Sequence, residues 1–179
     1  MVLKKWKILE SQVALDSKWF RIVKEKVKLS DSTILDDYYV WNSPDVSLII
    51  PVKNDGNIIL VRQYKHGAKD YMIEFPAGVV DEDEDPFECA KRELMEETGY
   101  SFATIEKIGV LINNPTKQRG RTHIFLAKDC VKASEQDLDH SEDIEVLEAN
   151  KEEVIDMAKD GRIWVSGSVA ALFLILDKI

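Results

Sequence analysis

Residues 78–100 read GVVDEDEDPFECAKRELMEETGY and contain the strongest local signals in the chain. Asp85 followed by Pro86 is typical of a helix N-cap and a proline in the first helical turn. Gly99 can adopt the left-handed backbone conformation that ends many helices. This stretch therefore predicts a helix over residues 86–98.

Apolar residues share one face of this predicted helix, with two glutamates beside them. At about 100 degrees per residue, Phe87, Ala90 and Leu94 fall within one narrow arc, so we expect them to face a core. Glu93 and Glu97 lie on the flank of that arc. A solvated acidic face is the ordinary explanation of a glutamate-rich helix, but carboxylates beside a core are costly unless a cation compensates them. The flank position favours a bound divalent cation such as Mg²⁺ or Mn²⁺, which prefer oxygen ligands.

The spacing of these residues resembles the Nudix box, G-x5-E-x7-R-E-U-x-E-E-x-G-U, where U is an aliphatic residue. The matching positions are Gly78, Glu84, Arg92, Glu93, Leu94, Glu96, Glu97 and Gly99. Tyr100 departs from the pattern, since an aliphatic residue is usual there. The chain thus looks like a Nudix hydrolase. The segments VRQYK, IEFPAG and NNPTKQRG resemble the ADP-ribose pyrophosphatase branch, in which a proline, here Pro115, follows the box at a set interval.

The resemblance implies an α/β (α+β) Nudix fold, an α/β/α sandwich with a mixed β-sheet, plus a small N-terminal antiparallel sheet. It also implies hydrolysis of a nucleoside diphosphate-linked substrate, with ADP-ribose giving AMP and ribose 5-phosphate. ADP-glucose, GDP-mannose or NADH are alternative substrates, because the loop PTKQRGR departs from the branch's usual pattern. A non-catalytic nucleotide-sugar-binding module is a further alternative, but such a protein would be expected to lose box glutamates.

Similar enzymes hold two or three Mg²⁺ or Mn²⁺ ions on residues of the box. By this resemblance, Glu93 and Glu97 are the main metal ligands and also catalytic residues. Glu96 is a further ligand, and the backbone carbonyl of Ala77 completes the set. The small residues Ala77 and Gly78 let the backbone turn sharply and approach a metal ion.

The general base of this branch comes from a loop well after the box, which the stretch SEDIEV resembles. Glu142 is the first choice for the base, and Asp143 and Glu145 are alternatives. A merely solvated acidic loop is the ordinary explanation of the same residues. Within the box, Arg92 is expected to orient a neighbouring glutamate rather than to touch the substrate.

The candidate substrate-binding residues are Trp19, Lys65, Pro115 and Arg121. Trp19 matches a position where relatives stack an adenine, although a core tryptophan agrees equally well with the sequence. Lys65 stands where relatives often have an arginine, and a lysine keeps the charge but loses the bidentate fork. Arg121 forms a local basic cluster with Lys117 and Arg119, which suits a terminal phosphate; a solvated loop is the alternative.

The patterning along the chain predicts two regions. Residues 1–43 contain strand-like stretches and form an N-terminal sheet region, whereas residues 44–179 form the Nudix domain. The stretch VSLIIPVKNDGNIILVRQYK predicts a hairpin with an Asn-Asp-Gly turn. Two helices follow near the C-terminus: the first ends at Gly161, and the second has Ser166 or Ser168 as its N-cap. Because strands and helices are mixed, we expect a sheet with helices on its faces.

The overall composition limits the partners. The chain has 179 residues, 45% of them hydrophobic, which suits one compact domain with a small appendage. Its 33 acidic residues outnumber its 24 basic residues, which argues against nucleic-acid binding and leaves a small nucleotide as the partner. No apolar run is long enough for a membrane span and no signal peptide is recognisable, so we expect a cytoplasmic protein. Relatives of this branch are dimers, and we expect a homodimer through the N-terminal strands.

Overall fold

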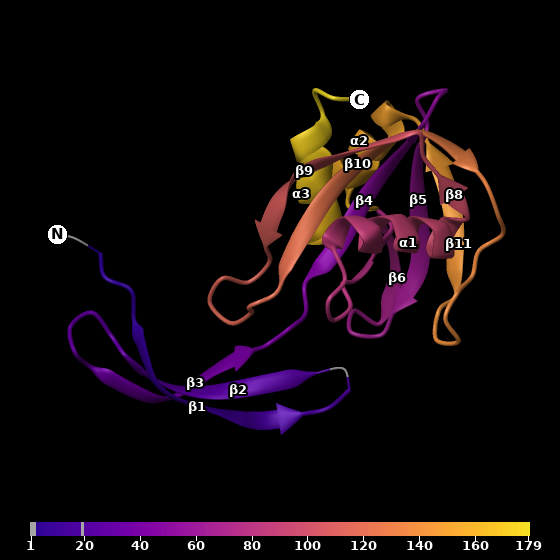
Figure 1. The fold of residues 1–179 in the computed structure, drawn as a ribbon. Helices are drawn as coiled ribbons and strands as arrows, with labels where there is room; N and C mark the ends of the chain where they lie inside the picture. The colour runs from indigo at the N-terminus through magenta and orange to yellow at the C-terminus, as the bar shows by residue number, and fades with distance from the viewer. Residues whose placement is uncertain (1–2, 19) are drawn as a thin grey trace. The chain divides into compact units, whose positions relative to one another are not determined.

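A computed structural model describes residues 3–18 and 20–179 of the chain. The chain separates into two compact units (Figure 1). The smaller unit comprises the chain up to Pro44 together with Ile112–Gly120, and the larger unit comprises Asp45–Leu111 and Arg121–Ile179. Within the described residues, no helix has the length and apolar character needed to cross a membrane.

The larger unit contains one mixed sheet and three helices. Its strands are β4 (Val46–Lys53), β5 (Ile58–Lys65), β6 (Asp70–Glu74), β7 (Ala77–Val79), β8 (Tyr100–Ser101), β9 (Thr104–Ile112), β10 (Arg121–Lys132) and β11 (Ile144–Ala149). Its helices are α1 (Pro86–Thr98), α2 (Lys151–Asp160) and α3 (Ser166–Ile175). The strand order is β11-β5-β4-β10-β8, with β6 beside β5, β7 beside β4 and β9 beside β10. β10 pairs with β4 in parallel, whereas the β11–β5, β5–β4 and β10–β8 pairs are antiparallel.

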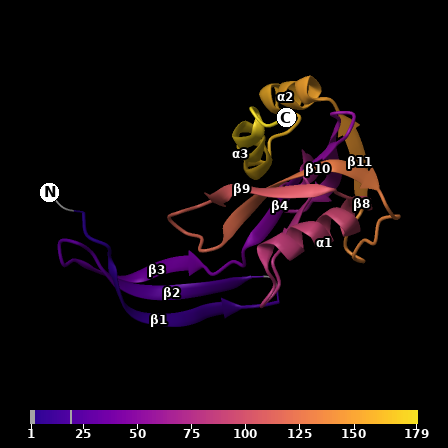
Figure 2. The same ribbon diagram turned by 45° about the horizontal axis from the view of Figure 1, so that its top comes forward.

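The central strands of this sheet are buried on both faces. Because side chains alternate along a strand, successive residues pack on opposite sides. Ile49, Ile59 and Phe125 pack with Ala90 and Leu94 of α1. Their chain neighbours form a second apolar cluster with α2 and α3, which includes Leu48, Ile50, Ile58, Leu60, Ile124, Leu126, Val154, Leu172 and Ile175. Figure 2 shows α1 on one side of the sheet and α2 and α3 on the other, which confirms the predicted α/β/α sandwich.

Helix α1 begins and ends where the sequence predicts. The Asp85 side chain accepts a hydrogen bond from the N–H of Phe87 (2.8 Å), and Gly99 ends the helix with φ 68°. Ala90 and Leu94 are fully buried, as expected, and Phe87 also faces the core but lies at its edge, with 37% of the residue exposed. Its ring stands in the first turn and meets Phe125 edge-on, which leaves its other side in solvent.

The ends of α2 and α3 follow different rules. Gly161 ends α2 in the left-handed conformation (φ 86°), as predicted. The predicted N-cap of α3 was wrong, because Val165 occupies this position and makes no side-chain cap. Ser166 is already inside the helix, and the buried hydroxyl of Ser168 instead accepts the N–H of Phe75 (3.1 Å). A buried backbone donor needs a partner, so the Ser168 hydroxyl binds the N–H of Phe75 and does not cap the helix.

The predicted hairpin joins β4 and β5. Lys53 donates its backbone N–H to the carbonyl of Asn57 (2.8 Å), and Val52 pairs with Ile58. Gly56 has φ 84°, a conformation that glycine adopts at little cost. The Asn-Asp-Gly signal is therefore confirmed as a tight turn between adjacent strands.

The smaller unit is a three-stranded antiparallel sheet with the order β1 (Lys7–Asp16), β2 (Arg21–Lys28) and β3 (Ile34–Trp41). The segment 112–120 packs on this sheet. The Tyr38 hydroxyl donates to the carbonyl of Thr116 (2.6 Å), and the Lys117 ammonium lies 3.8 Å from the centre of the Tyr38 ring. Arg119 forms an ion pair with the buried Glu25. The segment that follows β9 is thus part of the smaller unit.

Candidate active site

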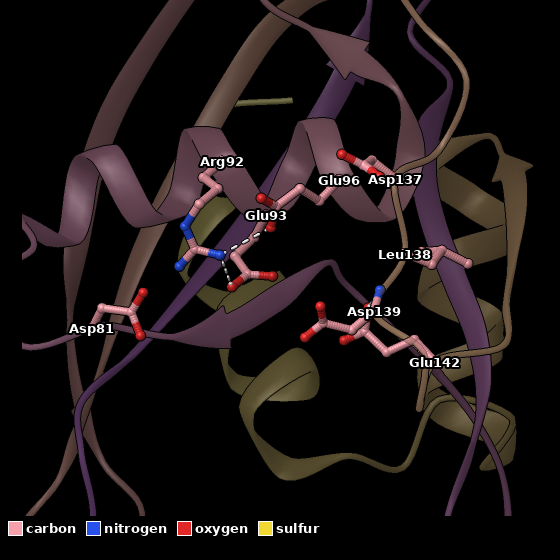
Figure 3. A pocket seen from close by; sticks show the side chains of 8 residues that line it. All are labelled: Asp81, Arg92, Glu93, Glu96, Asp137, Leu138, Asp139 and Glu142. Atoms are coloured by element: carbon pink, nitrogen blue, oxygen red, sulfur yellow. Dashed lines mark hydrogen bonds and ion pairs between the residues drawn. The ribbon is translucent and has the colours of Figure 1, made fainter.

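One arginine of α1 organises three carboxylates. The Arg92 guanidinium donates to both oxygens of Glu84, with Nε–Oε1 2.9 Å and Nη2–Oε2 3.0 Å. Its Nη1 donates to Glu93 (2.7 Å) and to Glu96 (2.9 Å), as Figure 3 shows. These hydrogen bonds lower the pKa of Glu84 to about 2 and raise the pKa of Arg92 above its usual value. Arg92 therefore fixes the side chains of neighbouring glutamates, and one cation is shared among three anions.

Gly78 has no room for a side chain. A Cβ atom built on it would lie 1.9 Å from Cδ of Glu93. The Glu93 carboxyl group therefore packs directly against the backbone of β7, which lies beside β4. Glu93 is buried, and burial raises its pKa while Arg92 opposes the rise. The glycine of the box is required here by a close approach rather than by a positive φ.

Glu97 is the most buried carboxyl group of the box, with 2% of the residue exposed. Its Oε2 atom accepts the backbone N–H of Ala77 (3.1 Å). Burial, and secondly the negative charge of Glu93, raise the pKa of Glu97 to about 8, while the charge of Lys65 acts in the opposite direction. Without a cation, this carboxyl group therefore holds its proton at neutral pH.

A pocket of about 360 Å³ opens beside these glutamates (Figure 3). Its lining residues are Asp81, Arg92, Glu93, Glu96, Asp137, Leu138, Asp139 and Glu142. Six of these eight residues are acidic and one is basic. The pocket therefore carries a strong negative charge that a single arginine does not balance.

The three candidates for the general base lie in different places. Glu142 lines the pocket, and its charge contributes to the raised pKa of Glu93. Asp143 is exposed and does not line the pocket. Glu145 forms an ion pair with Arg62 of β5. The geometry thus brings Glu142 toward the box glutamates and leaves the other two outside the pocket.

The donor set of the site suits a hard divalent cation. Within residues 3–18 and 20–179, no three histidine, cysteine, aspartate or glutamate side chains already converge in metal-binding geometry. The reason is visible in the contacts, because Arg92 holds Glu93 and Glu96 while Glu97 accepts from Ala77. Mg²⁺ and Mn²⁺ prefer oxygen ligands such as carboxylates. The carboxylates here have little compensating positive charge, which favours binding of a cation. The residues present therefore fit these metal ions.

The predicted substrate-binding residues are dispersed. Lys65 lies at the end of β5, with its Nζ atom 3.1 Å from the buried Glu74. Pro115 is exposed in the segment 112–120 of the smaller unit. Trp19 lies outside the described residues, so its predicted role is not addressed by the structure. The charge of Lys65 acts on a box glutamate, since it opposes the raised pKa of Glu97.

The three basic residues Lys117, Arg119 and Arg121 lie in different surroundings. Arg119 pairs with Glu25 and Lys117 lies over the Tyr38 ring, both within the smaller unit. Arg121 begins β10 of the larger unit, where its side chain is exposed. The sequence cluster therefore corresponds to three different local environments.

Sequence reasoning missed part of the acidic pocket. The additional lining residues are Asp81, Asp137 and Asp139. Asp81 lies inside the box, three positions after its glycine, and the other two belong to the same polar segment as Glu142. Proximity to the box and to the candidate base was the signal that could have identified them.

Comparison with known proteins agrees with this geometry. A model of the NUDIX domain matches residues 42–169, which is well over half of the chain. The chain belongs to the Nudix hydrolase family. The residues that surround Arg92 are therefore its Nudix box, with all the glutamates of the motif present.

Several relatives of this Nudix protein have names that state a substrate. The ADP-ribose pyrophosphatase of Bacillus subtilis (strain 168) is 29% identical over 130 residues, which cover 72% of this chain and 70% of that protein. The ADP compounds hydrolase NudE of Escherichia coli (strain K12) is 27% identical over 178 residues, covering 98% and 94%. A GDP-mannose pyrophosphatase of Salmonella arizonae is 38% identical over 114 residues, covering 59% of each chain.

The fold of the Nudix protein is shared over almost all of the chain with a solved structure. A crystal structure of an ADP compounds hydrolase matches with a TM-score of 0.87 and 24% identity, covering 99% of this chain and 95% of that chain. The match therefore includes the small N-terminal antiparallel sheet as well as the sandwich.

Proposed function

We propose that this Nudix protein hydrolyses the diphosphate bond of a nucleoside diphosphate-linked sugar in a metal-dependent reaction. ADP-ribose is the first candidate, with AMP and ribose 5-phosphate as the products. The observation that carries the proposal is the pocket, in which six acidic residues and one arginine lie beside a Nudix box that keeps all its glutamates. A diphosphate is itself anionic, so it can enter such a pocket only together with divalent cations.

The ligands of these cations would be Glu93, Glu96, Glu97 and the backbone carbonyl of Ala77. The chemistry supplied by Mg²⁺ or Mn²⁺ at these residues would be neutralisation of the diphosphate and a lower pKa of the attacking water. Ala77 and Glu97 already contact one another through the backbone N–H, so the strand and the helix that supply ligands are held together. We propose two or three ions, as in similar enzymes.

The side chains of the protein have separate roles in this proposal. Glu142 accepts the proton of the attacking water, because it lines the pocket and faces Glu93. Arg92 keeps Glu93 and Glu96 oriented through its two Nη1 hydrogen bonds. Lys65 contacts the diphosphate or the ribose, with Glu74 holding its ammonium group on the side of the sheet that carries α1.

A different nucleotide sugar is the second candidate substrate. The relatives named GDP-mannose pyrophosphatase reach a higher identity, 38% over 59% of the chain, than the relative named ADP-ribose pyrophosphatase. The relative named for ADP compounds spans nearly the whole chain, and this breadth of coverage supports an adenine nucleotide. A binding module without turnover is disfavoured because no box glutamate is lost.

We also propose that two copies of the chain form a dimer through the smaller unit. All ten residues of β1 are exposed, including Ile8, Leu9, Val13 and Leu15. An exposed strand with this many apolar side chains is a surface that a second chain can cover. In the proposed dimer, residues 1–43 supply the dimer contact and part of the substrate pocket, and residues 44–179 supply the catalytic groups.

A substrate panel tests the proposed function. The protein is incubated with Mg²⁺ or Mn²⁺ and ADP-ribose, ADP-glucose, GDP-mannose, NADH or diadenosine polyphosphates, and the products are separated by chromatography. We expect AMP and ribose 5-phosphate from ADP-ribose, and no product when EDTA is present. Faster turnover of GDP-mannose would replace the substrate assignment, and no turnover of any compound would refute the enzyme assignment.

A further inference from the structure

The segment between β10 and β11 is tied to the C-terminal end of α1. The backbone N–H of Asp137 donates to the carbonyl of Glu96 (2.9 Å), and the N–H of Ser134 donates to the carbonyl of Gly99 (3.0 Å). The last carbonyls of a helix have no partner within the helix, so they need donors from elsewhere. The first half of this segment supplies them and thereby caps the helix that carries the box glutamates.

Gln136 connects this helix end to β11. Its Nε2 atom donates to the carbonyl of Glu97 (2.6 Å) and to the carbonyl of Ile144 (3.0 Å). A side-chain amide has two N–H donors, and both are used here. Glu97 lies in the last turn of α1, and Ile144 is the first residue of β11. One side chain therefore closes the segment 137–143 at both ends.

The charges in this segment make such a link necessary. Asp137, Asp139 and Glu142 line the same pocket as Glu93 and Glu96, so like charges face each other across it. Their mutual repulsion pushes the segment away from α1 when no cation is bound. The Gln136 amide opposes this repulsion without adding a charge, because it binds backbone carbonyls and not carboxylates.

The candidate base moves with this segment. The Glu142 side chain accepts the backbone N–H of Asp139 (3.1 Å), and the Glu142 N–H donates to the carbonyl of Asp139 (2.9 Å). These two bonds make residues 139–142 one turn. The orientation of the Glu142 carboxylate is therefore set by how the whole turn is anchored.

We propose that Gln136 is a positioning residue, which holds the segment 137–143 against α1 and so keeps Glu142 facing the box glutamates. The assignment of Glu142 as the base rests on the proposed function. The link itself rests on the two hydrogen bonds of the Gln136 amide. Gln136 does not line the pocket, so it acts on the reaction through Glu142 and not by contact with the substrate.

Gln136→Met tests this role, because methionine has a similar length and no N–H donors. Hydrogen exchange of residues 137–143 in the metal-free protein should accelerate about tenfold or more. The kcat should fall about 10- to 100-fold while KM changes less than about threefold, since a displaced catalytic group costs rate rather than binding. Gln136→Glu keeps the shape of the side chain, but its ionised carboxylate has no N–H to donate. This variant should show the same faster exchange and lower kcat, and it replaces the methionine variant if that protein does not fold.

Ser134→Ala is the matched control, because Ser134 also lies between β10 and β11 but outside residues 137–143. The Ser134 hydroxyl contacts Met95 and the carbonyl of Glu135, and neither contact reaches β11. This variant should keep wild-type exchange and wild-type kcat. Folded Gln136 variants with unchanged exchange, or with faster exchange and unchanged kcat, would overturn the proposal. Exchange needs no substrate, so an inactive wild-type protein would refute the proposed function while the exchange result still decides the Gln136 link.

Discussion

The two units of this protein use apolar strands in opposite ways. In the larger unit, Leu48, Ile49 and Ile50 of β4 are almost completely buried, since α1 covers one face of the sheet and α2 and α3 cover the other. In the smaller unit, every residue of β1 is exposed, and Val13 and Leu15 are each about half exposed. The larger unit therefore completes its core within one chain, whereas the smaller unit presents apolar surface that its own chain leaves open.

The two units lack different things. The larger unit has a closed apolar core, but the negative charge of its pocket is not balanced, because the pocket has six acidic residues and one arginine. In the smaller unit the buried charge is balanced, because Glu25 is paired with Arg119, but the apolar side chains of β1 are uncovered. We therefore assign cations to the larger unit and a second chain to the smaller unit. Substitutions in the smaller unit should therefore leave cation binding unchanged, and substitutions in the larger unit should leave dimer formation unchanged.

The largest expected effect is that of Glu97→Gln in the larger unit. Removing this buried carboxylate should reduce kcat by about 1,000-fold or more, because the proposed reaction would lose a ligand of its metal ions. The fold should persist, since glutamine can still accept the N–H of Ala77. Steady-state kinetics and circular dichroism measure both properties. A folded variant with wild-type activity would contradict the ligand assignment, and the oligomeric state should not change.

Glu142→Gln should have the next largest effect. Loss of a general base typically costs about 100- to 10,000-fold in rate, so kcat should fall within this range. The matched substitution is Asp143→Asn, which removes a neighbouring carboxylate that does not line the pocket. Kinetics of both variants over a range of pH separate the two residues. A larger loss in Asp143→Asn would move the base assignment to Asp143, and an equal loss in both would contradict the assignment to Glu142.

Val13→Glu tests the open surface of the smaller unit. A charge on this exposed apolar strand should weaken the dimer about tenfold or more, because a desolvated carboxylate in an interface is costly. Gln12→Glu adds the same charge to the opposite face of β1 and should have less effect. Light scattering at several concentrations measures the change. A wild-type protein that is monomeric at all concentrations would contradict the proposed dimer.

The smallest expected effect concerns the pH dependence of stability without metal ions. Glu97 has a pKa of about 8 in the folded protein against an ordinary value of 4.5, so the folded state binds more protons between these values. Stability should therefore fall as the pH rises from 5.5 to 8.5, by about a few kcal/mol or several degrees in Tm. Glu84 acts with the opposite sign, but its pKa of about 2 places its effect below this window.

Glu97→Gln should flatten this dependence. Thermal melts of both proteins in EDTA measure the difference. An equal slope in the wild type and the variant would show that Glu97 is ionised throughout the range.

Local signals predicted much of the larger unit. The bounds of α1 and its cap at Gly99 follow from short-range chemistry, so the sequence was sufficient there. The failures concern contacts between distant segments. Ser168 looked like a helix cap, but its hydroxyl is taken by the N–H of Phe75, which lies 93 residues away. Phe87 faces the core as predicted, but its degree of exposure depends on which part of the sheet lies beneath the first turn of α1.

The site was predictable where the motif is contiguous and less so elsewhere. The box positions follow from spacing. Glu142, the first choice for the general base, lines the pocket, and its role as the base stays a prediction. The surroundings of Arg119 could not be predicted, because its partner Glu25 comes from a strand 94 residues earlier. The link made by Gln136 could not be predicted either, since it binds backbone carbonyls of α1 and β11, which any residue types would present.

The most direct test of the central claim, that cations complete the charge of the pocket, is calorimetric titration with Mn²⁺ at pH 7. The Glu97 carboxyl group, with a pKa of about 8, is mostly protonated at this pH, so binding of the cation must displace its proton. Titrations in buffers of different ionisation enthalpy should show release of about one proton per protein chain, and Glu97→Gln should bind Mn²⁺ more weakly and without this release. Binding of Mn²⁺ to the wild type without proton release, or with the same affinity in Glu97→Gln, would contradict the account.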